Sequence, residues 1–265
     1  MTDYRYPNEG LILLLTVLLV LGVIAFTSVA TLCGSALFLA GMVALAFWLN
    51  GRHHAALVGQ AEPVTAENIP ALHALVQETG GRLGVRALKV FVAPGRALNA
   101  YTFGLVEPQV IVLFTGLARV LDREELQFVI GHEMGHIQLG HTWLNSVIGG
   151  MAGIPSPYPA AALLYVAFRW WNRACEFSAD RAGLLACGRL DKAVSALIKI
   201  ATGGAALSAG SQQRALAALD RQDEDLGSLL GEAPSTHPLI ARRVDELRKF
   251  AASADYSRLR ARLNP

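Results

Sequence analysis

Residues 10–51 contain no Asp, Glu, Lys, Arg or His, and this apolar stretch constrains the fold more than any other part of the chain. One membrane-spanning helix needs about 20 apolar residues, so the stretch is long enough for two helices joined by a turn near residues 31–35. The alternative is a secretory signal, whose apolar core is typically about 7 to 15 residues long and follows a basic start. This start carries Asp3 and Glu9 with only Arg5. The stretch therefore predicts a retained transmembrane helical hairpin.

The charges beside the hairpin indicate its orientation. Arg5 and Arg52 flank it, whereas the expected turn has no positive charge. Because Lys and Arg are enriched on the cytoplasmic side of membrane helices, both ends of the hairpin are expected in the cytoplasm. We expect a multi-pass membrane protein, in the cell inner membrane if the source is bacterial, with the lipid bilayer as a partner. Residues 1–54 would be the anchor, and residues 55–265 a cytoplasmic catalytic domain.

The composition supports a membrane protein and argues against a nucleic-acid partner. Hydrophobic residues make up 53% of the chain and charged residues 17%, against about 25% charged in ordinary soluble domains. The formal net charge is only +2, and no basic stripe with interleaved aromatic residues is present, so we expect no nucleic-acid binding. The three cysteines have no regular spacing, which suits a reducing compartment rather than a disulfide framework.

The chemistry is indicated by His132-Glu133-Met134-Gly135-His136, which matches H-E-x-x-H. On a helix the two histidines lie about 40° apart around the axis, so their rings can converge on one cation. A catalytic zinc site usually takes three nitrogen or oxygen ligands and lowers the pKa of its water to about 7. Glu133 projects beside the pair, where it can take the proton of that water. The motif predicts zinc hydrolysis with Glu133 as general base.

The residues around the motif predict that it lies on a helix. Asp122 and Glu125 form an acidic capping box at the expected start. Apolar residues then recur at helical spacing: Leu126, Val129, Ile130 and Ile137.

The third zinc ligand has to come from elsewhere in the chain. His141 lies about 180° round a continuous helix from His132, and the extended motif that adds a third histidine requires Gly and His where Leu139 and Thr142 stand. That class of site is therefore excluded.

A downstream pair of carboxylates is the better source. Glu176 and Asp180 are four residues apart, so both project from one face of a helix. One could bind the metal while the other accepts the N–H of a ligating imidazole.

These motifs together resemble a known family. H-E-x-x-H followed by E-F-x-A-D-R-A-G at residues 176–183 is similar to the membrane-associated gluzincin peptidases typified by the CAAX prenyl endopeptidase and the bacterial heat-shock membrane protease. The resemblance covers roughly residues 66–250, including residues 98–104, which are similar to the family's N-A-F-x-x-G stretch, and Ser235-Thr236-His237-Pro238. It implies a zincin-like domain with one Zn2+ per chain and assigns these site residues: His132, His136 and Glu176 as ligands, Glu133 as base, and Asp180 as the partner of a ligating imidazole.

Short β-like runs at residues 88–93, 100–103 and 110–114 precede the motif. They predict a small sheet packed on the motif helix, so the expected fold class is mainly α with a small β-sheet (α+β). An exposed edge strand can hold an extended peptide through main-chain hydrogen bonds. The candidate, partly by the family likeness, is the stretch from Asn99 to Gly104, in which we expect Asn99 and Ala100 to contact substrate. A purely structural strand is an equally good interpretation.

The segment between the metal motifs departs from the family. Residues 142–168 carry no charge, but Pro155, Pro157 and Pro159 divide them into two pieces too short to span a bilayer independently. The heat-shock protease has two full spans in this interval. We expect this segment to pack close to the membrane.

His237 precedes Pro238 and a helix that carries Arg243. By the family likeness, His237 and Arg243 would stabilise the oxyanion that forms on the scissile carbonyl. The alternatives are an ordinary helix entry for His237 and ion pairs from Arg243 to Asp245 or Glu246.

The expected function is that of a membrane-anchored zinc endopeptidase acting on protein or peptide substrates near the bilayer, and a role in membrane-protein quality control would fit it. Two other functions stay open. One is a catalytically idle zinc-binding membrane adaptor, in which the metal contributes folding energy. The other is a zinc hydrolase of a non-peptide amide.

Overall fold

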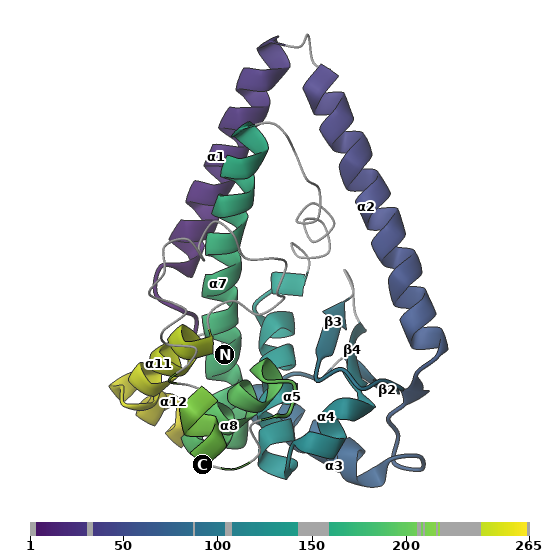
Figure 1. Cartoon of the computed structure of the whole chain (residues 1–265), viewed down its shortest axis with the longest axis vertical. Coiled ribbons are helices and arrows are strands. Elements are labelled where there is room, and N and C mark those ends of the chain that lie inside the picture. The colour runs from purple at the N-terminus through teal and green to yellow at the C-terminus, as the bar shows by residue number, and fades with distance from the viewer. Residues whose placement is uncertain are drawn as a thin grey trace.

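The computed structural model describes residues 4–30, 34–86, 88–103, 108–142, 159–205, 208, 210–215, 217 and 240–263. Helices dominate and four short strands form one small sheet, which confirms the expected mainly helical class. Figure 1 shows two long helices, α1 (Glu9–Ala30) and α2 (Gly34–Gly59), whose upper ends lie close together and whose lower ends reach a base that holds the sheet and most other helices.

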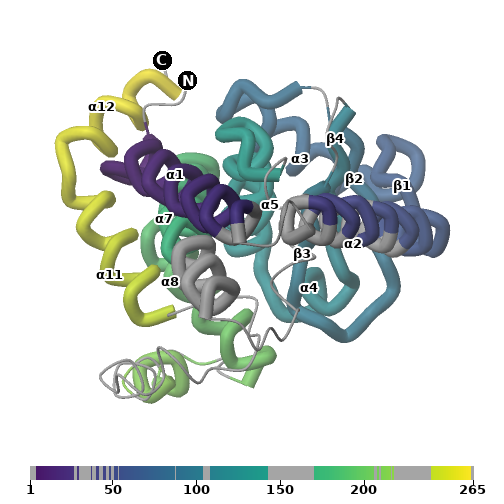
Figure 2. The backbone as a smooth tube through the Cα atoms, turned by 90° about the horizontal axis from the view of Figure 1, so that it is seen from above, coloured from purple at the N-terminus to yellow at the C-terminus, as the bar shows by residue number. Residues whose placement is uncertain are grey.

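Helix α1 is the described helix that is long and apolar enough to cross a membrane, over Glu9–Phe26 with a mean hydropathy of 2.7. One side of α1 packs on α7 (Pro159–Cys187), where Ile12 contacts a cluster with Trp171 and Cys175. Figure 2 shows α1 lying along α7, whereas α2 stands over the sheet. The last part of the proline-interrupted segment, from Pro159, continues into α7, and residues 143–158 lie outside the described residues.

The sheet has the strand order β1-β2-β4-β3. Its strands are β1 (Glu62–Pro63), β2 (Leu88–Ala93), β3 (Ala100–Phe103) and β4 (Gln109–Phe114). Strands β2 and β4 run parallel, whereas β1 and β3 are antiparallel to their neighbours. The three strands expected from the β-like runs are therefore confirmed, and β3 forms one edge. Ile111 and Val112 of β4 are fully buried and tie the sheet to the core.

Helix α5 (Arg123–Gln138) carries the H-E-x-x-H motif and lies at the centre of the base. The expected capping box is confirmed, because the Glu125 amide donates to the Asp122 carboxylate at 3.0 Å and the Asp122 amide donates to Glu125 at 2.8 Å. Buried Ile130 and Met134 anchor the helix in the main core. Four elements pack around α5: α3 (Pro70–Leu83), α7, α8 (Leu190–Ala201) and β3. The base also contains α4 (Thr115–Val120), α11 (Ile240–Ala251) and α12 (Ala254–Leu263).

Helices α5 and α7 approach closely because small residues line their contact. A Cβ built on Gly135 of α5 would lie 2.6 Å from the Cβ of Ala182, and one on Gly183 of α7 would lie 2.7 Å from the carbonyl oxygen of Phe128. Larger side chains at these positions would push the helices apart. The close contact brings the carboxylates of α7 within reach of the histidines of α5.

Candidate metal centre

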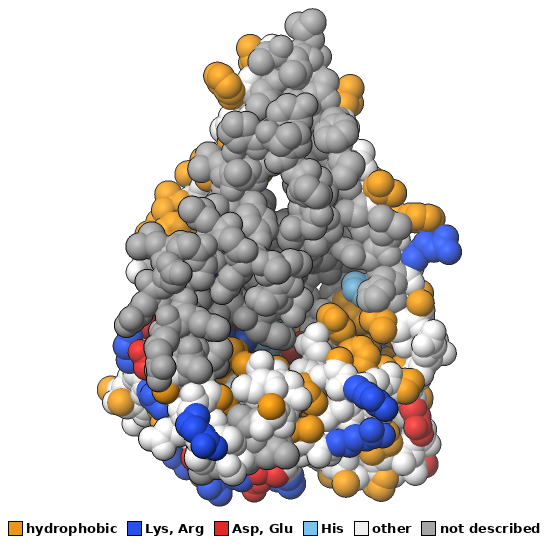
Figure 3. Space-filling view, viewed as in Figure 1, with side chains coloured by type: hydrophobic (Ala, Val, Ile, Leu, Met, Phe, Trp, Pro, Cys, Tyr) orange, Lys and Arg blue, Asp and Glu red, His pale blue; other side chains and the backbone are white. Residues whose placement is uncertain are grey.

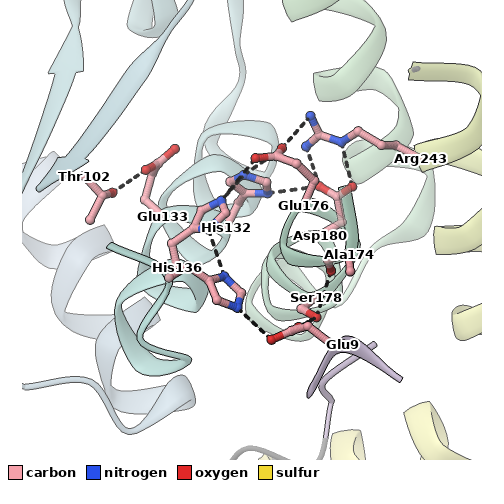
Figure 4. Close-up of polar contacts among 11 residues, drawn as sticks. Glu9, Thr102, His132, Glu133, His136, Ala174, Glu176, Ser178, Asp180 and Arg243 are labelled. Atoms are coloured by element: carbon pink, nitrogen blue, oxygen red, sulfur yellow. Dashed lines mark hydrogen bonds and ion pairs between the residues drawn. The ribbon is translucent and has the colours of Figure 1, made fainter. Parts of the chain in front are cut away.

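Two imidazoles and one carboxylate converge where α5 meets α7 (Figure 4). Nε2 of His132 and Nε2 of His136 lie 3.1 Å apart. Oxygens of Glu176 lie 3.6 Å from the first nitrogen and 3.5 Å from the second. Ligands of one tetrahedral zinc ion, bound at about 2.0–2.1 Å, are separated by about 3.3–3.4 Å. The three side chains therefore fit a single metal ion.

Glu176 is buried, yet its carboxylate is held in the charged form. Burial alone would raise the pKa of Glu176, but the Arg243 guanidinium and the two imidazoles hold this pKa well below its usual range. Nη1 of Arg243 lies 3.0 Å from Oε2, although the geometry of this contact does not make a hydrogen bond, and no described residue donates a hydrogen bond to Oε2. A buried carboxylate oxygen without such a partner is a natural metal ligand.

Asp180 fixes the orientation of His132. Its Oδ1 lies 3.0 Å from Nδ1 of His132. A carboxylate can only accept, so the ring donates from Nδ1 and turns the lone pair of Nε2 toward the centre. Arg243 donates to both oxygens of Asp180, at 2.6 and 2.8 Å. Burial opposes ionisation, but this guanidinium lowers the pKa of Asp180 below its ordinary value.

His141 lies beside His136, a position that the helical pattern did not predict. Helix α5 ends at Gln138, and Gly140 adopts a φ of +76°, which turns the chain back under the helix. Nδ1 of His141 consequently lies 3.0 Å from Nδ1 of His136. Burial lowers the pKa of His141 and favours its neutral ring. The signal for this return was Gly140 itself, since glycine after the last turn commonly ends a helix.

Glu133 and His132 both line a small pocket next to the metal centre. The hydroxyl of Thr102, on the edge strand β3, donates a hydrogen bond to Oε2 of Glu133. His132, Glu133 and Arg243 line the pocket together with a larger set of apolar side chains: Leu98, Leu117, Phe128, Val129, Leu197, Ile200 and Ile240. Thr102 was not singled out from the sequence, because a threonine in a short strand carries no motif.

The structure describes three of the four remaining candidate site residues. Asn99 and Ala100 line the same pocket, and the Asn99 side chain accepts from the Ala100 amide at 2.9 Å. Arg243 is buried against Asp180 and Glu176 rather than paired with Asp245 or Glu246. His237 lies outside the described residues.

A compact set of nitrogen and oxygen donors between two helices, with an edge strand and a pocket alongside, is the arrangement of a metal-dependent hydrolase. The model of "Peptidase family M48" matches residues 66–251. The chain belongs to this family of metallopeptidases, which confirms the resemblance seen in its motifs.

Curated relatives agree with this assignment. The chain is 26% identical to "Protease HtpX homolog" of Ralstonia pickettii over 83% of this chain and 87% of that protein. It is 28% identical to the protein of the same name from Thermococcus kodakarensis, over 69% of this chain and 74% of the relative. It is also 29% identical to "Plastoglobule-localized metallopeptidase 48, chloroplastic" of Arabidopsis thaliana, over 78% of this chain but only 64% of that longer protein.

Proposed function

We propose that this protein is a membrane-anchored zinc endopeptidase whose metal is held by His132, His136 and Glu176. The observation that carries the proposal is the convergence of two imidazole nitrogens and a buried carboxylate within 3.1–3.6 Å of one another. Two imidazoles and a carboxylate suit zinc.

When bound, zinc polarises a water molecule and the scissile carbonyl. Glu133 accepts the proton of the attacking water and delivers it to the leaving amine. The Thr102 hydroxyl orients Glu133 for this transfer through its hydrogen bond. Asp180 and Arg243 keep His132 and Glu176 in place. The family resemblance assigns stabilisation of the oxyanion to His237.

The substrate is a peptide bound in extended form beside β3. Strand β3 pairs with β4 on one side. On its other side no described strand pairs with it, so the main-chain groups there can pair with a peptide. Asn99 and Ala100 stand at the start of this strand and at the pocket. The lining of the pocket is mainly apolar, which favours a small apolar side chain of the substrate there.

The membrane anchor is residues 1–54, and the catalytic domain is the remainder on the cytoplasmic side. Large apolar side chains of α1 and α2 are exposed, among them Leu18 (55%), Phe26 (78%) and Leu37 (75%). Figure 3 shows hydrophobic side chains along the edges of the upper, tapered part, whereas the base carries charged side chains among hydrophobic ones. Such a division favours insertion of the tapered part into lipid as a helical hairpin. Substrates would be proteins in or near the membrane, which suits membrane-protein quality control.

The proposal is tested with the full-length protein in detergent and its Glu133→Gln variant. We expect both to bind zinc, and only the wild type to cleave casein or a quenched peptide. If wild-type protein with zinc bound cleaves no peptide, the protein is a zinc-binding adaptor or a hydrolase of another amide, and the endopeptidase proposal is wrong.

A further inference from the structure

We propose that Glu9 and His141 are positioning residues for the metal centre, which hold His136 in the tautomer that can bind zinc. This inference rests on the proposed function, because it takes His136 to be a zinc ligand. Under this proposal Glu9, the first residue of the apolar helix α1, helps to position a side chain of the metal centre.

Three buried side chains form a continuous chain of contacts from α1 to the metal centre (Figure 4). Oε1 of Glu9 lies 3.1 Å from Nε2 of His141. Nδ1 of His141 lies 3.0 Å from Nδ1 of His136. Nε2 of His136 then faces the centre. The exposed fractions of Glu9, His141 and His136 are 1%, 2% and 8%, so water does not compete for these contacts.

The direction of each hydrogen bond follows from the carboxylate at the start. An ionised carboxylate only accepts, so His141 carries its proton on Nε2 and donates it to Glu9. The Nδ1 of a neutral His141 is then an acceptor, and His136 must donate from its own Nδ1. This leaves the lone pair of His136 on Nε2, directed at the metal position. If both histidines carried their proton on the other ring nitrogen, Nε2 of His136 would bear a hydrogen and could not bind metal.

Glu9 is itself held in place and in the charged form by its neighbours. The guanidinium of Arg5 contacts Oε1, and the hydroxyl of Ser178 on α7 donates to Oε2. The Tyr6 amide donates to the same Ser178 hydroxyl at 2.8 Å, which fixes the segment before α1 against α7. The two zinc-binding histidines are thus oriented differently: His132 by a carboxylate directly, and His136 by a carboxylate acting through a second imidazole.

A second cation is the other occupant to consider, because Glu9, His141 and Cys175 offer ligand atoms that lie within 4.8 Å of one another. Both ring nitrogens of His141 already have partners, and Arg5 supplies a positive charge to Glu9. Burial also raises the pKa of the Cys175 thiol, which disfavours the thiolate that binds metals. The contacts therefore favour the hydrogen-bonded chain.

The test measures zinc affinity of the full-length protein in detergent by competition with a chromophoric chelator, together with the unfolding temperature of each metal-free form. Glu9→Gln introduces an amide N–H that can donate to His141 and stabilise the opposite tautomers. His141→Leu removes the acceptor, whereas His141→Gln retains a carbonyl oxygen that can accept from His136. Tyr4→Phe is the control, because Tyr4 bonds to Gln138 from the same segment without touching this chain of residues.

We expect Glu9→Gln and His141→Leu to weaken zinc affinity about 10–100-fold, His141→Gln to recover most of it, and Tyr4→Phe to bind zinc as the wild type does. Wild-type affinity in Glu9→Gln and His141→Leu would overturn the inference and leave the proposed function standing. A loss of affinity that follows unfolding temperature in all four variants, Tyr4→Phe included, would also overturn it. Absence of zinc binding by the wild type would overturn the proposed function itself.

Discussion

Gly135 of α5 faces Ala182 of α7 so closely that a Cβ on the glycine would lie 2.6 Å from the Cβ of the alanine. The two histidines and the two carboxylates belong to these two helices. The spacing of the helices therefore sets the size of the metal centre. Even a small increase in the distance between α5 and α7 would move Glu176 away from both imidazoles.

Gly135→Val is expected to destabilise the protein by about 1–3 kcal/mol through overpacking and to lower zinc affinity by widening the centre. The control is Gly81→Val on α3, where a Cβ meets no atom within 4 Å. Chemical unfolding and zinc titration check both variants. Zinc affinity of Gly135→Val equal to that of Gly81→Val would show that the close contact does not set the geometry of the site.

The ion pair between Asp180 and Arg243 offers a second test. Asp180→Asn removes the charge of one of the two carboxylates beside buried Arg243. Breaking a buried ion pair in this way destabilises the folded protein by about 3–5 kcal/mol. Asp245→Asn makes the same chemical change in an exposed ion pair with Arg248 on α11, and should change stability little. Denaturant unfolding of the metal-free proteins measures both effects.

The pH dependence of the Asp180→Asn effect follows from the lowered pKa of Asp180. A lowered folded-state pKa gives stability that is fully present above the unfolded value of about 3.9 and is lost as the pH falls through the folded value. The destabilisation by Asp180→Asn should therefore persist throughout the range from about pH 5 to 8. A destabilisation that vanishes within that range would contradict an Asp180 that is charged throughout it.

Thr102 tests how the edge strand contributes to catalysis. Thr102→Val removes the hydroxyl that donates to Glu133 while keeping the shape of the side chain. A hydrogen bond to a charged group contributes about 1.5–3 kcal/mol, so we expect kcat to fall about tenfold or more with zinc content unchanged. Thr102→Ser should restore most of the rate. Equal kcat for the Val and Ser variants would rule out the hydroxyl as the orienting group.

The orientation of the anchor can be measured by cysteine labelling. Asn8 precedes α1 and Gln60 follows α2, and both are exposed. In a chain whose Cys33 is replaced by Ala, Asn8→Cys and Gln60→Cys should both react with a membrane-impermeant maleimide only after the membrane is opened. Labelling of one position in intact cells and the other only in opened cells would mean that the chain crosses the membrane an odd number of times between them.

Local patterns predicted most of the fold. Two local signals could be read from the sequence because each depends on only a few neighbouring residues. They are the capping box at Asp122 and Glu125 and the β-branched runs of β2 and β4. The likeness of residues 176–183 to a known family pointed to the carboxylates of α7. The contacts of Glu9 and Thr102 could not be foreseen, because they depend on how distant elements pack. His141 was misplaced because a helical wheel does not continue past Gly140.

The proposed chemistry depends on His132, His136 and Glu176 together holding one zinc ion. The most direct measurement is the zinc content of purified full-length protein and of Glu176→Gln, determined by mass spectrometry after equal exposure to zinc, with circular dichroism to verify folding. We expect about one zinc per chain in the wild type and a large loss in the folded variant. A full equivalent of zinc retained by Glu176→Gln would contradict it.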